Sequence, residues 1–179
     1  MAVDPERLFK PINIALLTVS DTRGPEDDTS GDILADRIRN GGHHMIARAI
    51  EKDDVPRIVS KISNWLDDQR VDCIITTGGT GLTGRDVTPE ALDQIKQTNA
   101  GKEIPGFGEI FRLLSYNSIG TSTVQSRAMG LVARGKYIFA LPGSNGAVKD
   151  GWDGILAEQL DSRNRPCNFV ELMPRLKEL

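Results

Sequence analysis

The chain has 179 residues, of which 39% are hydrophobic and 26% charged, and its formal net charge is -3 at pH 7. This length and composition predict one globular domain over residues 1–179, with a substantial core. The sequence pI of about 5.4 gives no basic field, so we expect no nucleic-acid partner and only small anionic ligands.

At the N-terminus, residues 1–11 contain no apolar run of signal-peptide length, and no later segment approaches a membrane span. We therefore expect a cytoplasmic protein with no membrane partner. Residues 12–20 form a short apolar run that is typical of a buried strand. A polar loop then leads to a helix, which we expect Ser30 to cap and the glycine pair at 41–42 to end.

Further strands and helices alternate along the rest of the chain. We expect strands over 43–50, 71–77 and 135–141, and helices over about 56–69, 88–98, 106–120, 121–130 and 147–160. Thr88, followed by proline, is the expected N-cap of its helix, and the tail from residue 163 is expected to be irregular or a short strand. This alternation predicts an α/β fold with a parallel sheet covered on both faces.

The metal-binding residue types are sparse. Cys73 lies in an apolar run and Cys167 near the end of the chain, so we expect two ordinary thiols rather than a disulfide or metal pair. His43 and His44 are adjacent and would point to opposite faces of a strand. A structural zinc site is therefore not expected.

A glycine-rich loop, TTGGTGLTGRDV, separates the third strand from the helix at Thr88. Its G-x-G-x-x-G spacing matches the dinucleotide motif, but the helix begins several residues after Gly84, and no acidic residue ends a strand about 20 residues further on. Arg85 and Asp86 stand where a Walker A loop has lysine and serine or threonine. We therefore expect neither of these two nucleotide-binding folds.

The loop instead suggests a small phosphate site at the carboxyl end of a parallel strand, where open α/β sheets bind ligands. Glycine lets backbone amides approach phosphate oxygens, and the helix beginning at Thr88 adds partial positive charge. Asp86 would repel a phosphate unless a cation lay between them, and Mg²⁺ is the natural mediator. Alternatively, Asp86 supports the helix dipole and pairs with Arg85 in an ordinary turn. A second glycine loop, residues 142–146, also joins a strand to a helix and favours the ligand site.

Four segments resemble the MoaB/MogA family of molybdenum cofactor biosynthesis proteins, most of all its MoaB branch: TTGGTGLTGRDVTPEAL, PGFGEIFR, TSTVQSRAMG and FALPGSNGA. The resemblance covers nearly the whole chain, including LDSRNRPCNF. It implies a three-layer α/β/α domain with a mostly parallel sheet that binds molybdopterin and assembles as a trimer or hexamer. The MogA-like branch transfers AMP from Mg-ATP to the terminal phosphate of molybdopterin and releases pyrophosphate. A non-catalytic molybdopterin-binding or carrier paralogue is the alternative.

The resemblance also implies site residues. Asp86 and Asp53 would be the catalytic carboxylates that hold Mg²⁺, although Asp54 leaves the second position open by one residue. The residues that would bind ligand are Ser20, Asp21, Gly78, Gly79, Thr80, Gly81, Arg85, Ser126, Arg127, Pro142, Gly143 and Ser144. On sequence chemistry alone, Asp53 could instead cap the next helix, Asp21 could hold its own loop, and Arg127 could be a solvated helix charge or a subunit contact.

Overall fold

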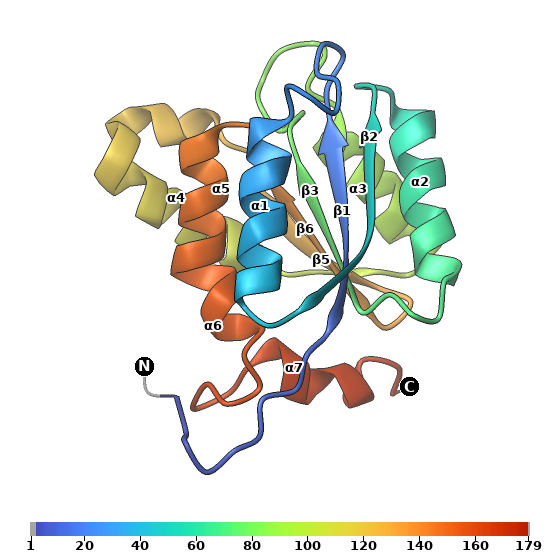
Figure 1. Cartoon of the computed structure of the whole chain (residues 1–179). Coiled ribbons are helices and arrows are strands. Elements are labelled where there is room, and N and C mark those ends of the chain that lie inside the picture. The colour runs from blue at the N-terminus through green and yellow to red at the C-terminus, as the bar shows by residue number, and fades with distance from the viewer. Residues whose placement is uncertain (1–2, 179) are drawn as a thin grey trace.

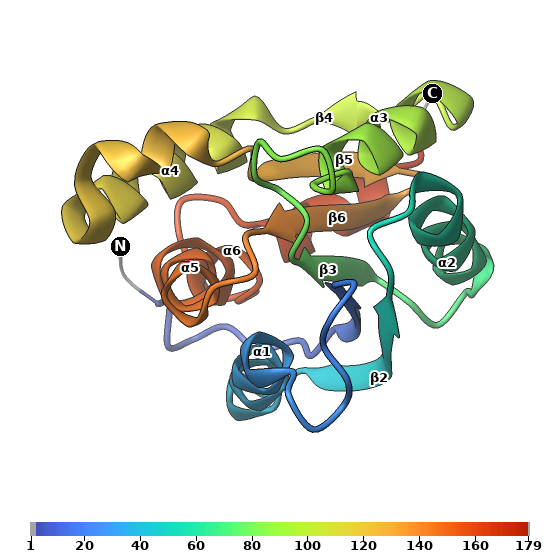
Figure 2. The same ribbon diagram turned by 90° about the horizontal axis from the view of Figure 1, so that it is seen from above.

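A six-stranded sheet lies between two helical layers in the computed structural model, which describes residues 3–178 (Figures 1 and 2). The strand order is β2-β1-β3-β6-β5-β4, and the first four of these strands are parallel, whereas β5 is antiparallel to both of its neighbours. The strands are β1 (Asn13–Val19), β2 (His44–Glu51), β3 (Cys73–Thr77), β4 (Lys102–Glu103), β5 (Met129–Ala133) and β6 (Lys136–Leu141). This confirms the expected three-layer α/β/α fold with a mostly parallel sheet.

Two groups of helices cover the sheet. Helices α1, α4 and α5 pack on one face, and α2 and α3 pack on the other (Figure 2). The helical segments are α1 (Thr29–Asn40), α2 (Val55–Asp67), α3 (Thr88–Thr98), α4 (Pro105–Ile119), η1 (Gly120–Gln125), α5 (Asn145–Gly151), η2 (Trp152–Leu156), α6 (Ala157–Gln159), α7 (Phe169–Leu172) and η3 (Met173–Arg175). Within residues 3–178, no helix has the length and apolar character needed to cross a membrane.

The central strands are apolar on both faces because each face meets a helical layer. In β1, Ile14 and Leu16 pack in the core under α1 and α5, whereas Ala15 and Leu17 pack in the core under α2 and α3. All four side chains are fully buried. A strand covered on both faces reads as a continuous apolar run, which is why these strands could be predicted from sequence.

Two expected helix caps are wrong. Asp28 caps α1, since its carboxylate accepts a hydrogen bond from the Gly31 amide at 3.0 Å, and Ser30 lies inside the helix. Thr88 lies in the first turn of α3 rather than before it, and its hydroxyl donates to the Gly78 carbonyl at 2.9 Å. The bond from Thr88 joins α3 to a loop ten residues earlier, which the local sequence does not reveal.

The expected helix over 121–130 is also wrong. Residues 120–125 form the short 3₁₀ helix η1, and β5 begins at Met129 and pairs with β6 through a hairpin. Arg134 and Gly135 at its turn both have positive φ, as tight hairpin turns require. In the tail, Asn168 caps the short helix α7, which corrects the expectation of irregular structure or a strand.

The loops after β1, β3 and β6 lie together at one end of the sheet, above the arrowheads in Figure 1. From β1 the chain crosses to β2 on one side and then returns to β3 on the other side. The crevice between β1 and β3 is therefore the point where the strand order reverses, which is the usual ligand position in open α/β sheets.

Candidate functional site

A cavity of about 420 Å³ opens at this end of the sheet. Its lining residues are Val19, Ser20, Thr22, Arg23, Asp53, Gly78, Gly79, Thr80, Gly81, Arg85, Asp86, Pro142, Gly143 and Ser144. The structure therefore brings together all of the site residues expected from sequence except Asp21, Ser126 and Arg127. The two glycine loops share one site, as the alternation of strands and helices predicts.

Close backbone contacts join the two glycine loops. The Gly78 amide donates to the Leu141 carbonyl at 3.0 Å, and a Cβ on Gly143 would lie 3.1 Å from the Gly78 Cα. Gly78 has a φ of +103°, and a Cβ there would clash with the carbonyl oxygen of Val19. Glycine is therefore required where the ends of β1, β3 and β6 meet.

The structure distinguishes the two adjacent aspartates before α2. Asp54 is the N-cap, since its carboxylate accepts from the Arg57 amide at 3.0 Å. Asp53 lines the cavity, and its Oδ1 would lie 2.8 Å from a Cβ on Gly79. Burial raises the pKa of Asp53, and the negative charges of Asp21 and Asp86 raise it further.

The carboxylate of Asp86 accepts hydrogen bonds from a residue of its own loop. Its Oδ2 accepts from the Thr83 amide at 2.9 Å and from the Thr83 hydroxyl at 2.6 Å. Burial acts to raise the pKa of Asp86, but these hydrogen bonds, together with the Gly81 amide and the charge of Arg127, outweigh it, and the pKa lies below its usual value. Asp86 does not pair with Arg85, which instead lies 3.5 Å from Asp21 in an exposed ion pair.

The two cavity carboxylates fit a magnesium ion that shares its ligands with a substrate. Among the described residues there is no cluster of three or more histidine, cysteine, aspartate or glutamate side chains able to hold a metal. Mg²⁺ is commonly held by only one or two carboxylates together with phosphate oxygens and water. Asp53 and Asp86 supply such a pair in the same cavity, and their mutual repulsion would be relieved by a cation.

Arg23 is a cavity residue that sequence reasoning missed. Its guanidinium donates to the Ser30 hydroxyl at 2.8 Å and to the Gly143 carbonyl at 2.9 Å, so it joins the loop after β1 to the loop after β6. The Ser20 hydroxyl accepts from the Arg23 amide at 3.1 Å. The available signal was a basic residue directly after the first strand, in the sequence SDTR.

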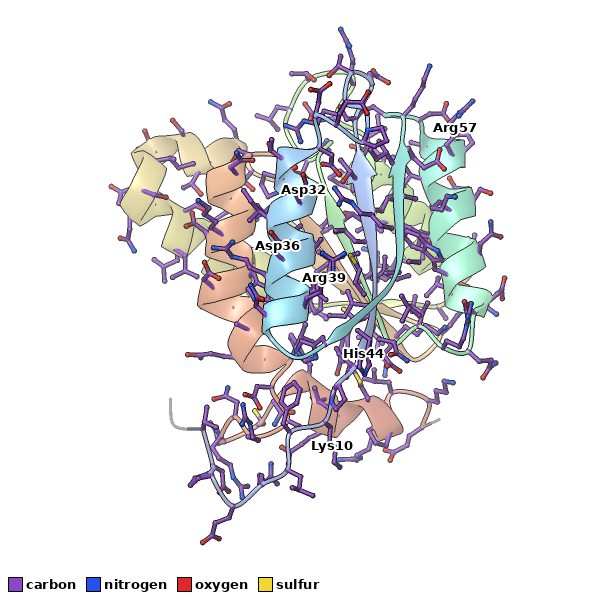
Figure 3. The ribbon with its side chains drawn as sticks, in the orientation of Figure 1. Lys10, Asp32, Asp36, Arg39, His44 and Arg57 are labelled. Atoms are coloured by element: carbon purple, nitrogen blue, oxygen red, sulfur yellow. The ribbon has the colours of Figure 1, made fainter. Side chains whose placement is uncertain are left out.

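A second cavity of about 650 Å³ adjoins the first and shares Ser20 and Arg23 with it. It lies between the loop after β1 and the end of β2, with Arg57 of α2 at its margin (Figure 3). Asp21 lines this second cavity rather than the first. The two cavities therefore meet at Ser20 and Arg23.

Ser126 and Arg127 are not among the residues that line either cavity. The Ser126 amide donates to the Thr123 carbonyl at 3.0 Å, and the Arg127 side chain donates to the Gly81 carbonyl at 2.8 Å. The guanidinium of Arg127 therefore contacts the glycine loop through its backbone carbonyls. Arg127 is therefore not a solvated helix charge, because its guanidinium is bonded to the loop and it follows the short helix η1.

Comparison with known proteins gives a consistent result. The family described as "Probable molybdopterin binding domain" matches residues 15–162. Molybdenum cofactor biosynthesis protein B of Escherichia coli (strain K12) is 48% identical over 170 residues, which cover 95% of this chain and 96% of that protein.

Two solved structures extend this result to the fold. A crystal structure of a molybdenum cofactor biosynthesis protein B has a TM-score of 0.84 and 34% identity, and the match covers 97% of this chain and 100% of that one. The tungsten cofactor synthesizing protein MoaB from Pyrococcus furiosus has a TM-score of 0.73 and 34% identity, with 83% of this chain and 92% of that one covered.

Proposed function

This chain belongs to the molybdopterin-binding family of molybdenum cofactor biosynthesis proteins, and from that premise we propose that it binds molybdopterin and adenylylates it with Mg-ATP. The observation that carries the proposal is the single cavity in which two glycine loops, Asp53 and Asp86 meet. Such a site offers backbone amides to phosphate groups and carboxylates to a divalent cation.

The reaction proposed is the transfer of AMP to the terminal phosphate of molybdopterin. An oxygen of that phosphate forms a bond to the α-phosphorus of ATP, the bond between the α-phosphorus and the bridging oxygen to the β-phosphorus breaks, and pyrophosphate leaves. The attacking phosphate is already ionised at neutral pH, so no general base is needed. The protein contributes by holding two anions close together and in line.

Each part of the cavity supports this proposal. The backbone of Gly78 to Gly81 would bind phosphate oxygens, and the Thr80 hydroxyl is buried without a partner in residues 3–178, so a ligand oxygen could satisfy it. Arg23 would add positive charge between the two cavities. Asp53 and Asp86 would hold Mg²⁺, which offsets the charge of the triphosphate when bound.

Substitution of Asp86 tests the enzyme proposal. Asp86→Asn keeps the side-chain volume but removes the charge that would hold Mg²⁺ beside the triphosphate. Molybdopterin binding should survive, because the ligand phosphate loses a repulsive neighbour. Mg-dependent pyrophosphate release should fall by roughly a hundredfold or more. Pyrophosphate release from molybdopterin and Mg-ATP measures the rate, and direct titration with molybdopterin measures binding.

A non-catalytic molybdopterin-binding or carrier protein is the second candidate. The two internal hydrogen bonds from Thr83 favour it, because they already satisfy the Oδ2 atom of Asp86. Such a protein would bind molybdopterin yet release no pyrophosphate above background. That result with the unmodified protein, beside an active adenylyltransferase as positive control, would replace the enzyme proposal with the binder.

We also infer that the protein assembles with itself, as a trimer or a hexamer. Five large apolar side chains of α4 and η1 are exposed in the single chain: Ile110, Leu113, Tyr116, Ile119 and Val124. Groups of exposed apolar side chains are typical of protein interfaces. They support burial of α4 against other copies, and closed symmetry is the common form of such assemblies.

A further inference from the structure

Arg127 contacts both ends of the glycine loop. Its backbone amide donates to the Thr80 carbonyl at 3.0 Å, its Nε to the Gly81 carbonyl at 2.8 Å, and its Nη2 to the Asp86 carbonyl at 2.6 Å. Its Nη1 pairs with Glu90 in the first turn of α3. One residue from the segment before β5 therefore fixes the start of the loop, its end and the helix that follows it.

These contacts orient the peptide units of the loop. In a planar trans peptide, the carbonyl of one residue and the amide of the next point in opposite directions. Because the carbonyls of Thr80 and Gly81 point to Arg127, which does not line the cavity, the amides of Gly81 and Leu82 point the other way. The Gly81 amide faces the carboxylate of Asp86 on that side and helps to lower its pKa.

We propose that Arg127 is a positioning residue, which holds the glycine loop so that the amide of Gly81 and the carboxylate of Asp86 face the ligand cavity. This inference rests on the proposed molybdopterin site and changes the role that family resemblance gives to Arg127, from ligand contact to support of the loop. Arginine suits this task better than lysine, because its planar guanidinium donates from three nitrogens in fixed directions to separate carbonyls, whereas the donors of lysine all lie on one nitrogen.

Arg127 is itself held in place from α4. The guanidinium of Arg112 donates to the carbonyls of Ser126 and Ala128, at 3.4 and 3.3 Å, on either side of Arg127. The hydrogen bond from Arg127 is also the main cause of the lowered pKa of Glu90. The support therefore runs from α4 through Arg127 to the loop.

Arg127→Ala tests the proposal through loop exchange and ligand affinity. Amide hydrogen exchange in residues 80–87 of the ligand-free protein should become at least about tenfold faster, while β1 and β6 keep their protection. Affinity for molybdopterin should fall about tenfold, because the loop loses the side-chain hydrogen bonds to the carbonyls of Gly81 and Asp86, although the backbone amide of residue 127 still donates to Thr80. Guanidinium ion at a sub-denaturing concentration should restore part of the affinity, and it should not affect the unmodified protein.

Two further variants complete the test. Arg39→Ala removes an exposed arginine from α1, far from the loop, and should change neither exchange nor affinity (Figure 3). Arg127→Lys keeps the charge and should give an intermediate affinity, and it replaces the alanine variant if that variant does not fold. Unchanged exchange in residues 80–87, or equally faster exchange in β1 and β6, would overturn the proposal. If the unmodified protein does not bind molybdopterin, the proposed function fails, while the exchange comparison still decides the role of Arg127.

Discussion

The surroundings of Asp53 disfavour the charged form of its carboxylate. Burial raises its pKa, and Asp21 and Asp86 add like charges nearby. The native protein therefore binds a proton at this position more strongly than the unfolded chain does. The free energy of unfolding then decreases as pH rises from the ordinary aspartate pKa to the raised one, and the loss persists at higher pH.

Asp53→Asn should therefore stabilise the protein at neutral pH while it weakens Mg-dependent pyrophosphate release. We expect Tm at pH 7 to rise by about 1–3 °C, since a change of about 1 kcal/mol corresponds to roughly 2–4 °C at this chain length. The gain should shrink as pH approaches the ordinary carboxyl range of about 4. Scanning calorimetry across pH measures both trends, and Asp54→Asn is the control, because asparagine is also a good N-cap. A lower Tm for Asp53→Asn at pH 7 would contradict this account.

Some residues of the site could be predicted from the sequence and others could not. The glycine loop and Asp86 could be placed at the ligand site from sequence because the evidence for them is the local spacing of residues. Asp53 and Asp54 are equivalent in sequence, and only the hydrogen bond from the Arg57 amide identifies Asp54 as the cap. Arg23 was missed because its partners, Ser30 and Gly143, lie in other loops.

At the level of elements, Asp28 joins α1 to two strands. Its buried carboxylate accepts from the Thr18 hydroxyl of β1 at 2.7 Å, from the Gly31 amide at 3.0 Å and from the Arg48 guanidinium of β2 at 2.7 Å. Arg48 also contacts the exposed Asp32, which is visible on α1 in Figure 3. The start of α1, and with it the loop that carries Arg23, depends on this carboxylate.

Asp28→Ala should reduce the free energy of unfolding by about 3 kcal/mol, because it removes a cap and leaves Arg48 and Thr18 without their buried acceptor. Asp32→Ala, which breaks only the exposed half of the same arrangement, should cost less than about 1 kcal/mol. Urea unfolding of both variants measures the difference. Equal losses would show that burial of Asp28 is not what stabilises α1.

Elements defined by long-range pairing were the ones that sequence analysis missed. Of the four parallel strands, β1, β3 and β6 were predicted because each is a buried apolar run, whereas in β2 apolar residues are interspersed with His44, Arg48 and Glu51. In contrast, β4 has only two residues, and β5 follows a segment whose local pattern resembles a helix. What makes Met129–Ala133 a strand is its pairing with β6, which no local pattern contains.

For the whole molecule, the exposed apolar side of α4 is the main feature that a single chain leaves unexplained. Leu113 is 64% exposed, Tyr116 54% and Val124 77%, although each is a large hydrophobic residue. Figure 1 shows α4 at one side of the molecule, opposite α2. Assembly through this side would leave the open end of the sheet free for ligands.

Light scattering should therefore give a mass that is three or six times the 19.6 kDa of the chain. Leu113→Asp places a charge in the proposed interface and should dissociate the assembly at micromolar concentration. Leu8→Asp alters a leucine near the N-terminus that is even more exposed, at 85%, and should leave the mass unchanged. A monomeric unmodified protein would contradict the proposed assembly.

The position of Arg112 on α4 has a consequence for how the protein works in dilute solution. One side of this helix faces the proposed partner, and Arg112 binds the backbone on both sides of Arg127. Dissociation would free α4 on its outer side and loosen the support of the loop. The rate of turnover per chain should then decrease as total protein is diluted at constant substrate, and the midpoint of that decrease should fall at the protein concentration at which light scattering shows half of the assembly dissociated.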